Sequence, residues 1–86
     1  MKYSLYLTIR KEFFDSIKSG KKKIEYREIK KYWTDKFSKL QCPFTAMFQN
    51  GYSADSPRLY AVINKIEKDE IGNVYKLHIG GIQHGC

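Results

Sequence analysis

Short segments in which apolar and polar residues alternate recur along this chain, and they constrain its fold more than any other feature. Side chains of a β-strand point alternately to the two faces of a sheet, so alternation predicts strands with one buried face. The pattern predicts five strands, at residues 3–9, 23–29, 43–49, 58–67 and 74–79. Turn-forming residues separate the last three strands, at 50–57 and 69–73.

Two stretches place apolar residues at helical spacing instead. Residues 10–19 carry the first pattern, and Gly20 then fits the left-handed position that follows many helix ends. In the second stretch Trp33, Phe37 and Leu40 are spaced i, i+4 and i+7, which predicts a short helix packed on the core.

The fold that follows is α+β and mainly β, a small mixed β-barrel with one or two flanking helices. Five strands in 86 residues favour a closed or nearly closed sheet, because closure removes aggregation-prone edges. A chain of this length suffices for a single domain, residues 1–86, with one modest core. Its longest apolar runs are far shorter than the roughly 20 residues of a membrane span, so we expect no membrane association.

The net charge of +7 is distributed unevenly. Residues 1–40 contain twelve Lys or Arg and five Asp or Glu, whereas residues 41–86 contain four of each and are neutral. A one-sided basic field favours polyanions, and nucleic acid is the first candidate. A solvated basic surface that only keeps the protein soluble explains the charge equally well.

Cysteine and histidine predict neither a disulfide framework nor a metal site. Cys42 and Cys86 are too few for a framework, and neither has a metal-type spacing with His78 or His84. We interpret the fragment formed by His84 and Cys86 as part of the tail of the chain rather than as a metal site. We therefore expect no metal, no cofactor and a cytoplasmic location.

The segment 20–27 concentrates the chemistry of the chain. Its glycine bend and lysine run lead into a strand in which Glu25 and Arg27, two residues apart, share one face. Glu25 can hold Arg27 or Lys22 in place while the cations face a ligand, and free backbone N–H groups in the turn can add to an anion site. Arg suits phosphate because its planar fork donates two parallel hydrogen bonds. An ordinary ion pair beside a solvated lysine loop is the alternative.

These residues also carry a family resemblance. Gly20, Lys22, Glu25 and Arg27 match the signature G-x-K-x-x-E-x-R of the ASCH family, whose small domains are related to PUA RNA-binding domains. The similarity extends over nearly the whole chain, through the opening strand, the helix that ends at Gly20, Tyr32-Trp33, and the segments 48–52 and 74–80.

The resemblance implies a PUA-like β-barrel whose cleft, lined by the signature residues, faces RNA or a nucleotide. Family members are proposed to bind RNA, some bacterial ones look like ribonucleases, and one branch hydrolyses the amide of acylated cytidine. In that branch the lysine at the Lys22 position is catalytic and a threonine occupies the position of Glu25. This chain has glutamate there and lacks that branch's acidic helical insertion.

We therefore predict a small bacterial or phage-type protein that binds RNA or a modified nucleotide in a basic cleft; its oligomeric state stays open. The predicted nucleic-acid-binding residues are Lys21, Lys22, Lys23, Glu25, Arg27, Asn50 and Tyr52. Two alternatives remain. The first is a small metal-independent ribonuclease or nucleoside amidohydrolase with Lys22 and Glu25 as catalytic residues. The second is a protein-interaction module, such as an inhibitor encoded by a mobile element.

Three further side chains admit two interpretations each. Because side chains alternate along a strand, Tyr26 points away from Glu25 and Arg27, and we predict that it packs in the core rather than stacks on a base. Trp33 likewise favours the core, although an exposed tryptophan can stack on a base. His78 shares a strand face with Lys76, which favours a surface histidine over a general base that lines a groove.

Overall fold

A computed structural model describes residues 2–83 of the chain. Its elements follow in the order β1 (Leu5–Ile9), α1 (Lys11–Lys18), β2 (Ile24–Glu28), α2 (Lys31–Ser38), β3 (Phe44–Asn50), β4 (Arg58–Asp69) and β5 (Val74–Gln83). These bounds agree with the predicted ones to within about two residues, except that β5 continues four residues beyond Ile79. The segment that contains His84 and Cys86 lies outside the described residues.

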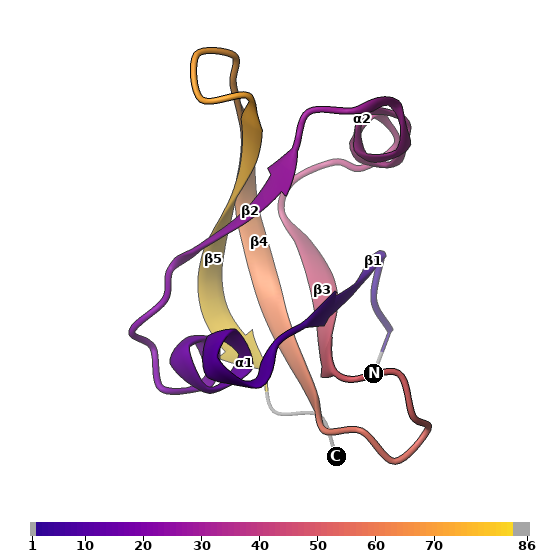
Figure 1. Ribbon diagram of the computed structural model, residues 1–86, viewed down its shortest axis with the longest axis vertical. Coiled ribbons are helices and arrows are strands. Elements are labelled where there is room, and N and C mark those ends of the chain that lie inside the picture. Colours follow the sequence, from indigo (N-terminus) through magenta and orange to yellow (C-terminus); the bar gives the residue numbers. More distant parts are fainter. Residues whose placement is uncertain (1, 84–86) are drawn as a thin grey trace.

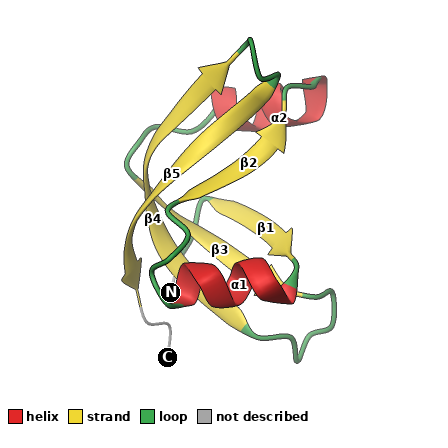
Figure 2. Cartoon of the chain, turned by 60° about the vertical axis from the view of Figure 1, so that its left-hand side comes forward, coloured by secondary structure: helices red, strands yellow, loops and turns green. Residues whose placement is uncertain are grey.

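The five strands form one mixed sheet in the order β1-β3-β4-β5-β2. β1 runs parallel to β3, and the other neighbours are antiparallel. The sheet curls into a half-barrel, so that its two edge strands, β1 and β2, come to face each other across an open side (Figures 1 and 2). The predicted α+β, mainly β, barrel-like fold is confirmed.

The curl is concentrated in the long β4–β5 pair. Its register shifts twice, between Ala61 and Ile63 and again between Ile63 and Lys65, and such irregularities bend a strand and increase its twist. Gly80 lies at this bend, where a Cβ atom would come within 2.5 Å of the Asn64 amide nitrogen. A residue without a side chain therefore leaves room here for the Asn64 side chain.

The hydrophobic core fills the concave face of the sheet. Its largest fully buried side chains are Phe48, Leu7, Ile17, Ile63 and Leu77. The two helices lie at opposite ends of the sheet (Figures 1 and 2). From α1, Phe14 and Ile17 reach the core, and from α2, Phe37 packs edge-on against Tyr75 at 5.0 Å between ring centroids. Within residues 2–83, neither helix is long and apolar enough to cross a membrane.

The prediction that Tyr26 lies in the core is wrong. In the β2–β5 ladder Glu25 pairs with Leu77 and Arg27 with Tyr75, and directly paired residues share a face of the sheet. Glu25 and Arg27 therefore point to the concave side, while Tyr26 points outward and is 48% exposed. Alternation identifies two faces of a strand but does not say which one is inside.

The fold predicts unequal effects for two isoleucines. Replacing the fully buried Ile63 by alanine leaves a cavity in the core, and we expect it to lower the free energy of unfolding by about 2–5 kcal/mol. The same change at Ile71, fully exposed in the β4–β5 turn, is expected to alter it by less than about 0.5 kcal/mol. Urea denaturation of both variants measures the difference; equal losses would contradict the assignment of the core.

Candidate functional site

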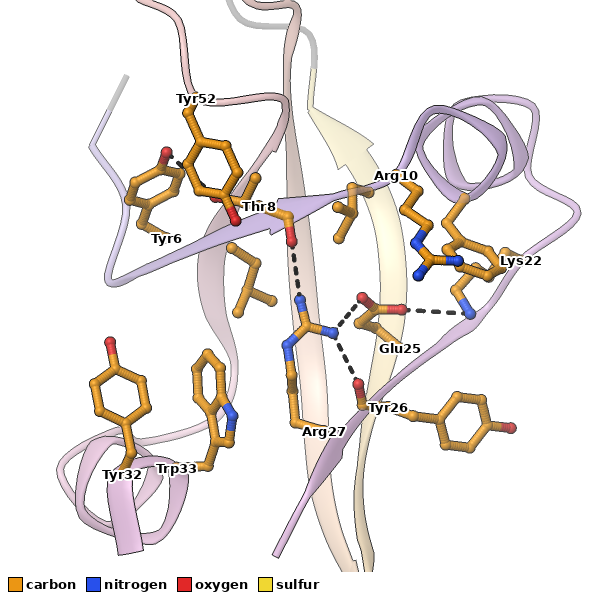
Figure 3. A pocket seen from close by; sticks show the side chains of 13 residues that line it. Tyr6, Thr8, Arg10, Lys22, Glu25, Tyr26, Arg27, Tyr32, Trp33 and Tyr52 are labelled. Atoms are coloured by element: carbon orange, nitrogen blue, oxygen red, sulfur yellow. Dashed lines mark hydrogen bonds and ion pairs between the residues drawn. The ribbon is translucent and has the colours of Figure 1, made fainter. Parts of the chain in front are cut away.

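A pocket of about 580 Å³ occupies the open side of the half-barrel, between the two edge strands. Its walls come from β1, the start of α1, the Lys22 turn with β2, the first residues of α2 and the loop after β3 (Figure 3). Elements far apart in the sequence thus meet here because the sheet curls.

A buried carboxylate lies at the centre of this pocket. Glu25 is 5% exposed, and each of its oxygens faces a cation: Oε1 lies 3.3 Å from Lys22 Nζ and Oε2 lies 2.5 Å from Arg27 Nη1 (Figure 3). Both cationic side chains are themselves largely shielded from solvent. Burying a carboxylate is costly unless it is paired and hydrogen-bonded, and Glu25 meets both conditions.

The end of α1 directs Lys22 toward that carboxylate. Gly20 adopts φ +85°, and the chain then folds back so that the Lys22 N–H donates to the Ser16 carbonyl at 3.0 Å. This N–H is therefore not free to bind an anion, contrary to one sequence-based hypothesis. The Lys22 ammonium lies 4.9 Å from the ring centroid of Phe13 and 5.2 Å from that of Tyr26, so two aromatic faces hold it in place.

Arg27 links the two edge strands. It donates from Nη2 to the Thr8 carbonyl of β1 at 3.3 Å and from Nη1 to the Tyr26 carbonyl at 2.8 Å. Its guanidinium also lies 5.4 Å from the ring centroid of Trp33 on α2. One side chain therefore contacts both edges of the sheet and a helix, on the side where β1 and β2 do not pair.

Aromatic side chains form much of the remaining wall. Trp33 stacks on Phe37 and packs against the core, as predicted, and it also lines the pocket. Tyr6, Tyr32 and Tyr52 line it as well and are substantially exposed (Figure 3). Exposed aromatic faces beside cations give the pocket both stacking surfaces and charge.

Gln49 organises the loop that carries Tyr52. Its buried side chain donates to the carbonyls of Gly51 at 2.9 Å and Ser53 at 3.1 Å, and it accepts from Arg58 Nε at 3.2 Å. These three hydrogen bonds fix the loop after β3, and Tyr52 of this loop lines the pocket while remaining 88% exposed.

The structure brings together only part of the predicted set. Lys22, Glu25, Arg27 and Tyr52 line the same pocket. Lys21 and Lys23 are not among its lining residues, and Asn50 lies with Tyr52 in a neighbouring hollow of about 400 Å³.

Several lining residues were not predicted. Arg10, at the junction of β1 and α1, contributes a third cation, and within residues 2–83 it forms no ion pair. Phe13, Tyr6 and Tyr32 add aromatic faces. One signal in the sequence points to Arg10, an arginine between a strand and a helix in the basic half of the chain, but no local pattern indicates that it lines the same pocket as Lys22.

His78 lies outside the pocket, in agreement with its interpretation as a surface residue. Its Nε2 is 2.9 Å from Glu67 Oε1, and this hydrogen bond keeps the pKa of Glu67 below its usual value. Within residues 2–83, Cys42 is an exposed free thiol, and no group of three or more His, Cys, Asp or Glu side chains is placed to hold a metal ion.

The chain matches no protein-family model, and no curated protein matches it. The resemblance to the ASCH family therefore stays a prediction from the sequence.

The geometry predicts that Glu25 contributes to stability through its charge. Glu25→Gln keeps the volume but leaves Lys22 and Arg27 facing a neutral amide, and we expect a loss of about 1–3 kcal/mol in the free energy of unfolding. Glu28→Gln removes the same charge from an exposed position of the same strand, where the nearest cation, Lys30, is 3.7 Å away, and should cause no measurable loss.

Urea denaturation of these two variants gives the comparison. If both variants lost the same free energy of unfolding, the buried ion pairs of Glu25 would contribute no more to stability than the exposed pair of Glu28. A cycle that combines Glu25→Gln with Arg27→Gln should show coupling, with the double variant less destabilised than the two single variants together.

Proposed function

We propose that this protein binds RNA or a modified nucleotide in the pocket between β1 and β2. The observation that carries the proposal is that three cations and several exposed aromatic faces line one open pocket. Cations attract the phosphate backbone, and aromatic rings stack on unpaired bases. The volume of about 580 Å³ falls within the range of small-ligand sites.

The cations retain donors for a phosphate. Lys22 has three N–H donors and faces a single carboxylate oxygen, while Arg27 uses its Nη1 and Nη2 groups in hydrogen bonds to Glu25, Tyr26 and Thr8 and keeps others of its five N–H donors. Arg10 adds a guanidinium with no ion pair among the described residues. In this arrangement Lys22 and Arg10 bind the phosphate, and Arg27 both contacts the ligand and holds the pocket open.

The resemblance to the ASCH family supports the same function, because its signature residues Lys22, Glu25 and Arg27 line the pocket together. The proposal includes a basic cleft of the PUA-like type and a cytoplasmic location, where RNA and nucleotides are available. It favours a single-stranded or flipped-out nucleotide, since the base must leave its duplex stack to reach an aromatic wall.

The enzymatic alternative has less support from the geometry. A general base must reach the substrate, whereas Glu25 is 5% exposed and each of its oxygens already faces a cation. Glu25 is better suited to positioning Lys22 and Arg27 than to proton transfer.

A comparison of two neighbouring lysines tests the proposal. Lys22→Gln should weaken binding of a fluorescent ten-nucleotide single-stranded RNA about tenfold or more, because a cation is removed from inside the pocket. Lys23→Gln removes the same charge from a residue outside the pocket and should have a much smaller effect. Fluorescence anisotropy at several salt concentrations gives the affinities, with circular dichroism to verify folding and Lys22→Arg as a charge-retaining variant.

Equal losses in the Lys22 and Lys23 variants would indicate diffuse surface charge and contradict the pocket as the binding site. The RNA recovered from each sample should remain intact. Cleavage that Lys22→Gln abolishes would instead establish the enzymatic alternative.

A further inference from the structure

A second hollow continues the pocket toward the amino-terminal end of β1. It measures about 350 Å³ and is lined by Ser4, Tyr32, Asp35, Lys36 and Lys39. Tyr32 lines both hollows, so the two share a wall. The second hollow plays no part in the site described above.

The charges of this second hollow favour an anion. Asp35 forms a 2.7 Å ion pair with Lys31. Lys36 and Lys39 are exposed, and within residues 2–83 neither forms an ion pair. Two lysines without a carboxylate partner and one neutralised aspartate leave this end of α2 positive.

Tyr32 occupies the junction between the two hollows. It is 58% exposed, its ring packs edge-on against Trp33 at 4.8 Å, and the ammonium of Lys36 lies 5.5 Å from its centroid. An exposed ring held by a neighbouring tryptophan and beside a cation is suited to stacking on a base between two phosphates.

The positive and aromatic groups thus extend along β1 from Arg10 to Ser4, about six residues apart. At about 3.3 Å per residue this path is about 20 Å long. A stacked strand of nucleic acid rises about 3.4 Å per nucleotide, so the path holds at most about six nucleotides.

We infer that the ligand is a segment of single-stranded RNA several nucleotides long, which continues from the pocket over Tyr32 to Lys36 and Lys39 at the carboxyl-terminal end of α2. This inference rests on the proposed function, because it requires that the pocket bind one nucleotide of the strand. It adds a second phosphate-binding site and excludes a ligand confined to a mononucleotide.

The test compares the length dependence of binding in two double variants. Lys36→Gln/Lys39→Gln should weaken binding of a six-nucleotide RNA about tenfold while leaving binding of a nucleoside monophosphate unchanged. The control, Lys18→Gln/Lys65→Gln, removes the same charge from exposed lysines that line neither hollow and should bind the six-nucleotide RNA nearly as the wild type does. The log–log salt slope should also become shallower by about 0.7 for each phosphate that the variant no longer neutralises.

The outcomes separate this inference from the proposed function. If the wild type binds a monophosphate and a six-nucleotide RNA equally tightly, or if both double variants lose affinity equally, the extended path is wrong and the pocket remains. If the wild type binds neither ligand, the proposed function fails as well.

Discussion

The paired carboxylate of Glu25 is the interaction on which the open side of this molecule depends. It is buried among core residues of the concave face, where an unpaired charge would be strongly unfavourable. Lys22 and Arg27 each occupy one of its oxygens, and Arg27 extends the network to the Thr8 carbonyl of β1. β1 and β2 are the edges of the sheet and do not pair with each other. This network connects them in place of the backbone hydrogen bonds that would join them in a closed barrel.

The unpaired edges of the open barrel explain which side chains line the pocket. Unpaired strand edges expose backbone groups that attract other chains, and proteins protect them with charge or with covering elements. Here the Arg27 guanidinium contacts both edges, while the side chains of α1 and α2 flank the gap. The same groups that satisfy the edges also leave N–H donors and aromatic rings facing the pocket, so protection of the edges and the groups available to the proposed ligand have one structural origin.

Much of the fold was predictable because it depends on local periodicity. The alternation of Phe44, Ala46 and Phe48 predicted β3, and Gly20 ends α1 with a positive φ as expected. The orientation of β2 was not predictable, since Ile24 and Tyr26 alternate with Glu25 and Arg27 and hydrophobicity alone selects the wrong face. Pairing with β5 decides the orientation, and that register is a property of the folded sheet. The signature residues were identified correctly as neighbours because they are close in the sequence. Arg10 and Tyr32 were missed because only the folded sheet brings them to the same pocket.

The basic and neutral halves of the sequence form different parts of the fold. Residues 1–40 carry the whole net charge of +7, and they also supply β1, α1, β2 and α2, the elements that surround the open side. Residues 41–86 are neutral and supply β3, β4 and β5, the three adjacent central strands of the sheet. The basic half therefore lines the opening while the neutral half forms most of the sheet behind it, with Tyr52 as its contribution to the pocket. A basic surface that served solubility alone would have no reason to place two of its cations on one buried carboxylate and a third, Arg10, in the same pocket.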